Sequence, residues 1–242
     1  MSARSTFRSR HRLPSAKGFV ESLLDPIDRL SETIFSILIL LTFTLAFRII
    51  KFSGSPQASF TSENVNELLI GALSAILAWG LIDGVMYALL GLFERGERHR
   101  LLKNIQAAES EPEAVSTIAD ELDYILEPIS DDAVRQKLYA SVYTHLKDSQ
   151  PRPVSFNRYD FTGALGHVVV ALIAVVPSLT PLLLLRHDPA LAIRISNIVS
   201  FVVLFIVGYR WGQYTGANPW RTGLLLTAVA MVMVLVAIPL GG

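Results

Sequence analysis

Asp83 is the residue whose chemistry most needs an explanation, because its carboxylate interrupts an apolar stretch, LLIGALSAILAWGLIDGVMYALLGLF, at residues 68–93. An acidic side chain near the middle of a membrane helix costs about 2.5 to 3.5 kcal/mol on insertion scales and needs a compensating role. At a rise of about 1.5 Å per residue, Asp83 lies about 15 Å from the end of the stretch at Phe93. Two roles stay open: a cation or proton site in the membrane, or a protonated or hydrogen-bonded side chain that fastens helices.

Three further side chains are candidates for the same path. Glu32 opens one apolar stretch and His167 lies about two turns into another, so both can line the inner mouth of a path below Asp83. Each residue alone is also common as an interface or packing residue. Met86, about one turn beyond Asp83, offers a soft thioether ligand, although methionine in a membrane span is usually filler.

Two polar pairs with helical spacing lie between the second and third apolar stretches. Glu94 and Glu97 are three residues apart, as are His145 and Asp148, so each pair shares one face of a helix. Carboxylate oxygens and imidazole nitrogens are suitable ligands for a divalent metal. The four residues therefore form a second candidate metal site.

Small residues and prolines predict how the apolar helices pack. Glycine or alanine recurs every fourth position at Gly80, Gly84 and Ala88, and again at Gly208, Gly212 and Gly216. This spacing lets helix backbones approach closely and also fits a dimer contact. Pro177 and Pro181 are expected to kink or break the helix that contains them.

The overall composition indicates a membrane protein. Of the 242 residues, 51% are hydrophobic and 17% are charged, and the formal net charge is zero. This balance offers no basic excess that would favour nucleic acid. The chain has no cysteine, which excludes disulfides, thiolate metal sites and cysteine nucleophiles.

About 20 apolar residues in a helix cross the hydrocarbon core, and five stretches approach that length. They are residues 33–50, 68–93, 161–185, 191–209 and 222–240. We expect residues 1–30 to be a cytoplasmic tail, residues 31–93 and 161–242 to hold spans 1–2 and 3–5, and residues 94–160 to be a cytoplasmic helical insertion.

The distribution of lysine and arginine predicts the orientation. Seventeen of the 21 lie in the N-terminal tail, in residues 94–160 or in the turn between the last two spans. Because cytoplasmic flanks carry the excess of positive charge, we expect the N-terminus inside and the C-terminus outside. A bacterial inner membrane fits this bias and the expectation of a retained N-terminal tail.

The insertion is predicted to contain three helices, at residues 94–108, from Ser110 to Leu126, and from Ser130 to His145. In the second, Ser110 and Glu113 form a capping box. Its apolar face is predicted to comprise Val115, Ile118, Leu122 and Ile125. About 65 residues make a small domain, so we expect these helices to pack on one another, on a second copy or on the membrane.

This arrangement resembles the vacuolar iron transporter family. Residues 163–185 (GALGHVVVALIAVVPSLTPLLLL) and the two spans that follow are similar to the family's third to fifth helices. Residues 78–98 (AWGLIDGVMYALLGLFERGER) are similar to its second helix and the start of its metal-binding insertion. The resemblance covers about 210 residues through loose motifs.

The resemblance implies a homodimer, with a path between the first two helices of each copy that exports iron or manganese in exchange for protons. By position, Glu32 and Asp83 match acidic residues of the family's first two helices. Glu94 with Glu97, and His145 with Asp148, match ligands of its insertion. The chain departs from the family in lacking the Asp-Gly of the first helix, and Ile105 and Ala108 replace a further glutamate pair.

Two functions are therefore predicted. The first is a divalent-cation transporter for Fe²⁺ or Mn²⁺, without a tightly bound cofactor. The second is a membrane scaffold of the same fold that does not transport. An enzyme is not expected, because the sequence has neither HExxH nor GxSxG. Membrane lipid, divalent cations and a second copy of the chain are the expected partners.

Overall fold

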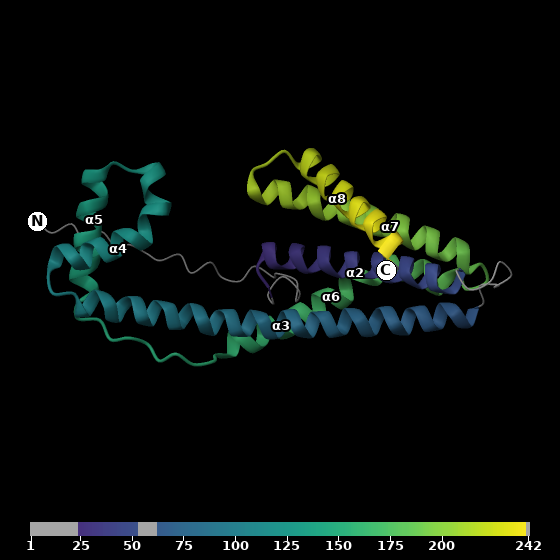
Figure 1. The fold of residues 1–242 in the computed structure, drawn as a ribbon, viewed down its shortest axis with the longest axis horizontal. Helices are drawn as coiled ribbons and strands as arrows, with labels where there is room; N and C mark the ends of the chain where they lie inside the picture. The colour runs from purple at the N-terminus through teal and green to yellow at the C-terminus, as the bar shows by residue number, and fades with distance from the viewer. Residues whose placement is uncertain (1–23, 53–61, 241–242) are drawn as a thin grey trace, which may run out of the picture. The chain divides into compact units, whose positions relative to one another are not determined.

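The computed structural model describes residues 24–52 and 62–240, and all regular elements in that part are helical (Figure 1). The elements are α2 (Pro26–Phe52), α3 (Ser62–Ala107), α4 (Glu111–Leu126), the 3-10 turn η1 (Glu127–Ile129), α5 (Asp132–Leu146), α6 (Arg158–Leu184), α7 (Pro189–Thr215) and α8 (Pro219–Leu240). The predicted all-α class is thus confirmed for the described residues. Most of the predicted N-terminal tail, residues 1–23, lies outside them.

Five of these helices are long and apolar enough to cross a membrane, as the sequence predicts. The candidate spans are Pro26–Phe47, Glu63–Ala107, Arg158–Leu184, Pro189–Thr215 and Pro219–Val236. Large apolar side chains on their outer surfaces are exposed, among them Leu81, Ile82, Val202, Ile206, Leu224 and Leu225. Apolar exposure of this extent fits contact with lipid and agrees with an integral membrane protein.

The chain divides into two compact units. We call Met1–Val85 with Phe161–Gly242 the membrane unit, and Met86–Asp160 the inserted unit. The division falls within α3, which is a single 46-residue helix. The inserted unit therefore begins eight residues before the boundary that hydropathy predicts at Glu94.

All five candidate spans contribute to the core of the membrane unit. Its buried members include Leu40, Leu41, Leu68, Ile76, Val175, Leu182, Ala192, Leu204, Ala230 and Val234. Polar contacts between described residues also join helices within this core. Thr44 Oγ1 on α2 donates to Asn197 Oδ1 on α7 at 2.8 Å, and Ser196 Oγ on α7 donates to the Ser178 carbonyl of α6 at 2.6 Å.

Glycines at four-residue spacing allow close contact between helix backbones, as predicted. A Cβ at Gly84 would lie 2.5 Å from the Ala164 carbonyl oxygen, so α3 and α6 meet at van der Waals distance there. A Cβ at Gly208 would lie 2.9 Å from Gly223 Cα, between α7 and α8. These two helices run side by side from a short turn (Figure 1). Gly216 differs, because it adopts φ 73° and ends α7 in the left-handed conformation that glycine favours.

Pro177 and Pro181 do not break α6, which is continuous from Arg158 to Leu184. The break is therefore excluded, and a kink at these prolines stays a prediction. Each proline lacks the N–H that would bond to the carbonyl four residues earlier. The Ser196 hydroxyl contacts α6 between the two prolines, at the Ser178 carbonyl, and so ties this weakened stretch to α7.

The inserted unit has a small core of its own. Ile105, Ala114, Ile118 and Tyr139 are buried in it. One half of the predicted capping box is present, since Ser110 Oγ accepts from the Glu113 N–H at 3.4 Å. The Glu113 carboxylate accepts from the Glu109 N–H at 2.9 Å instead of from that of Ser110. The predicted apolar face is wrong at one end: Ile125 is 50% exposed, whereas Ala114 is buried.

Tyr139 joins α5 to α4 in the inserted unit. Its side chain is buried and its hydroxyl donates to Asp123 Oδ1 at 2.6 Å. Arg135 Nε lies 3.1 Å from the same carboxylate oxygen. Burial, together with the hydrogen bond to Asp123, raises the pKa of the Tyr139 phenol above its ordinary value. The phenol therefore stays protonated at neutral pH and remains a donor.

Candidate functional site

The membrane unit brings together two residues that the sequence analysis singled out. Glu32 lies in the second turn of α2 and His167 in the third turn of α6. Glu32 Oε2 lies 2.7 Å from His167 Nδ1, and their side chains are 3% and 12% exposed. Ser36 Oγ donates to the other carboxylate oxygen at 3.5 Å. We call this arrangement the Glu32–His167 pair.

The Glu32–His167 pair can hold a proton or offer ligands to a cation. At 2.7 Å the imidazole can donate a hydrogen bond to Oε2 when Nδ1 carries a proton. Without the proton, the imidazole nitrogen and the carboxylate oxygen form a mixed N and O ligand pair suited to first-row divalent metals.

The pair also fixes the relative depth of α2 and α6. Glu32 precedes the first predicted span by one residue, whereas His167 lies six residues inside the third, or about 9 Å along its axis. The contact between Glu32 and His167 places these two residues at the same level along the packed helices. The first six residues of the third predicted span, from Phe161 onward, therefore lie beyond that level, on the N-terminal side of His167.

Asp83 lies in a different environment from Glu32. It is partly exposed and lines a groove of about 440 Å³ with Phe35, Leu38, Ile39, Thr42, Trp79 and Met233. Within residues 24–52 and 62–240, no hydrogen bond or ion pair reaches its carboxylate. Gly84 next to it packs against Ala164, which holds this turn of α3 against α6 and leaves Asp83 on the groove side.

Met86 does not join Asp83 in that groove. Its side chain is 48% exposed, and it is not among the residues that line the cavity. The spacing of one turn places the thioether near Asp83 along the helix, but the two side chains do not line the same groove. A common ligand set of Asp83 and Met86 remains a prediction.

The two pairs predicted in the insertion are not joined in one cluster. Glu94 and Glu97 line a hollow of about 520 Å³ with Asp120 and Glu121, and His145 and Asp148 are not among its lining residues. Glu94 Oε2 accepts from Arg98 at 3.1 Å. In the part of the chain that the structure describes, no three His, Asp or Glu side chains converge as metal ligands.

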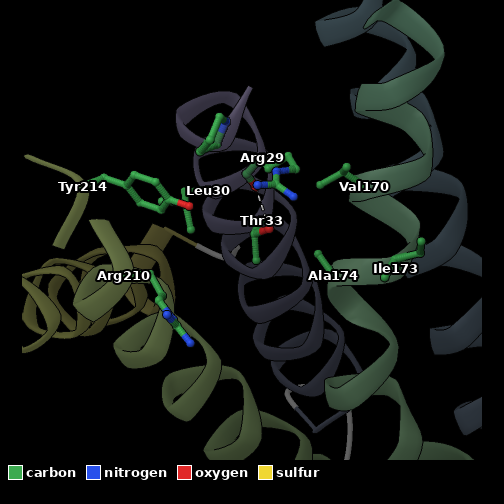
Figure 2. A pocket seen from close by; sticks show the side chains of 9 residues that line it. Arg29, Leu30, Thr33, Val170, Ile173, Ala174, Arg210 and Tyr214 are labelled. Carbon is green, nitrogen blue, oxygen red and sulfur yellow. Dashed lines mark hydrogen bonds between the residues drawn. The ribbon is translucent and has the colours of Figure 1, made fainter. Parts of the chain in front are cut away.

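A second pocket in the membrane unit was not anticipated from the sequence (Figure 2). It measures about 410 Å³ and lies between α2, α6 and α7. Arg29, Thr33, Arg210 and Tyr214 contribute polar side chains to its lining, and Leu30, Val170, Ile173 and Ala174 contribute apolar ones. In the sequence these arginines contributed only to the orientation of the chain, because nothing in their spacing joins α2 to α7.

No protein-family model matches the chain, and no curated protein matches it. The resemblance to the vacuolar iron transporter family thus stands on the residues quoted for it.

Proposed function

We propose that this protein is a membrane transporter that moves a divalent cation, Fe²⁺ or Mn²⁺, out of the cytoplasm in exchange for protons. The Glu32–His167 pair is the observation that carries the proposal. An ionisable pair buried among apolar helices is costly and is typical of ion pathways and proton relays. In this proposal the pair binds a proton or the cation in turn.

The chemistry of the pair supports such an exchange. A carboxylate oxygen and an imidazole nitrogen 2.7 Å apart can share one proton, and the same two atoms can instead coordinate a dication. The proton and the dication cannot be bound at the same time. Mutual exclusion at one site is the simplest basis for coupling two flows. Water, or a second copy of the chain, would complete the coordination of the metal.

The proposed orientation places the N-terminus and the inserted unit in the cytoplasm. Support comes from the lysine and arginine excess in residues 94–160 and from the odd number of candidate spans. The hollow lined by Glu94, Glu97, Asp120 and Glu121 also contains Arg98 and Arg100, so its carboxylates outnumber its guanidinium groups and would attract cations from the cytoplasm. The absence of cysteine makes single-cysteine labelling in a bacterial inner membrane a direct test, without background thiols.

The deciding experiment is flux into proteoliposomes that contain the full chain. We expect Mn²⁺ and Fe²⁺, but not Mg²⁺, to move with counterflow of protons, which a pH dye trapped in the vesicles reports. Glu32→Gln removes the charge with little change of shape and should lower metal flux at least tenfold. Asp28→Asn, one turn earlier on α2, is the matched control and should leave flux unchanged.

A non-transporting scaffold is the second candidate function. It is favoured by the finding that no three metal-ligand side chains converge among the described residues. Under this alternative, correctly folded wild-type protein would give no metal-dependent flux, and Glu32→Gln would be indistinguishable from it. That result would overturn the transporter proposal.

A further inference from the structure

We propose that the groove beside Asp83 binds an organic cation with an apolar, aromatic body. This site is separate from the Glu32–His167 pair and does not rest on metal transport. The groove lies within the membrane unit, between α2, α3 and α8. Its polar and apolar parts each select one property of the ligand.

The single carboxylate selects positive charge. The described residues that line the groove include no arginine, lysine or histidine, and Asp83 is the only ionisable group among them. No hydrogen bond or ion pair to Asp83 exists among the described residues. An unpaired carboxylate in an apolar environment attracts a cation strongly, because little water competes for it.

The remaining lining selects an apolar and aromatic body. Trp79 lies one turn before Asp83 on α3, and Phe35 faces the groove from α2, with 51% and 53% of these side chains exposed. Aromatic faces attract cations through their quadrupoles, tryptophan most strongly. Met233 from α8 adds a polarizable surface that adapts to ligand shape.

Size and donor set argue against a bare metal ion. The groove measures about 440 Å³, within the roughly 300 to 1,000 Å³ typical of small-molecule sites. Among the described lining residues, only Asp83 and Thr42 offer side-chain oxygens, and Thr42 Oγ1 already donates to the Ile39 carbonyl at 2.9 Å. A divalent ion needs about four to eight ligands, whereas a delocalised organic cation needs none at fixed geometry.

Trp79 provides the readout for a binding test. Tetraphenylphosphonium is the probe, and purified full-length protein in detergent micelles is titrated while tryptophan fluorescence is followed. We expect saturable quenching in the wild type and its loss in Trp79→Phe, which would assign the signal to the groove. Asp83→Asn should weaken binding at least tenfold, and Asp83→Glu should retain it.

Two controls distinguish recognition of the probe's charge from nonspecific hydrophobic binding. Triphenylphosphine oxide has a similar body without the charge and should bind equally weakly to wild type and Asp83→Asn. Glu63→Gln, an exposed acid at the start of α3, should bind the probe like the wild type. Each variant is first checked for helix content and monodisperse elution.

Three results would overturn the proposal. Equal affinity of wild type and Asp83→Asn would show that the carboxylate is not recognised. Equal binding of the neutral analogue would indicate an apolar groove that lipid chains fill. Displacement of the probe by micromolar Mn²⁺ in the wild type, but not in Glu32→Gln, would assign Asp83 to the metal path. Failure of metal flux with intact probe binding would remove only the transporter proposal.

Discussion

Glu32 and Asp83 are carboxylates in helices apolar enough to cross a membrane, yet the fold places them in different environments. Glu32 is 2% exposed and its partner His167 lies 2.7 Å away on another helix. Asp83 is partly exposed beside aromatic side chains and has no partner among the described residues. A buried charge must be satisfied by the protein itself, whereas a charge in an open groove is available to a ligand. The comparison predicts different consequences when each carboxylate, or its surroundings, is changed.

The largest effect on stability is expected when His167 is removed. His167→Ala leaves the Glu32 carboxylate buried without its principal partner, and breaking a buried pair in this way costs about 3 to 5 kcal/mol. Denaturant unfolding in micelles measures the loss. His187→Ala, at an exposed histidine between α6 and α7, is the matched control. A similar small loss for both variants would contradict the structural role of the pair.

A smaller effect is expected at the contact that positions Asp83. Gly84→Ala places a methyl group 2.5 Å from the Ala164 carbonyl oxygen, so the backbones must separate. Overpacking of this kind costs about 1 to 3 kcal/mol. Gly96→Ala on the same helix has nothing within 4 Å of the added group and should be stabilising. Thermal unfolding of the two variants in parallel checks the expected opposite signs.

The smallest effect is expected for Asp83 itself. Asp83→Leu removes a carboxylate that bonds to no described residue, so the free energy of unfolding should change by about 0.5 kcal/mol or less, or rise. Thermal unfolding in micelles, next to His167→Ala, measures the contrast. A loss as large as that of His167→Ala would mean that Asp83 fastens helices, which is the second role that its sequence context allows.

The sequence predicts the helices well because their signals are local. Hydropathy located all five candidate spans, and the Ser110 cap marks the start of α4. Hydropathy does not predict the contact between Glu32 and His167, because 135 residues separate them and no local motif around either residue indicates the other. Both residues are expected at the inner mouth of one path, but hydropathy gives the length of a span and not its depth, so their direct contact does not follow from it. The groove of Asp83 depends on three helices and on Gly84, which lies close enough to Ala164 only in the packed fold.

The turn between α7 and α8 constrains how the chain enters the membrane during synthesis. Only residues 216–218 separate Thr215 from Pro219, and a Cβ at Gly212 would lie 2.7 Å from Pro219 Cα. With so short a connection, α8 follows α7 directly during synthesis and is held next to it as soon as it is made. The glycine faces of the two helices then cover each other, which removes them from contact with lipid. A chain that stops before Pro219 would leave the glycine face of α7 open in the bilayer, where cellular quality control can recognise it.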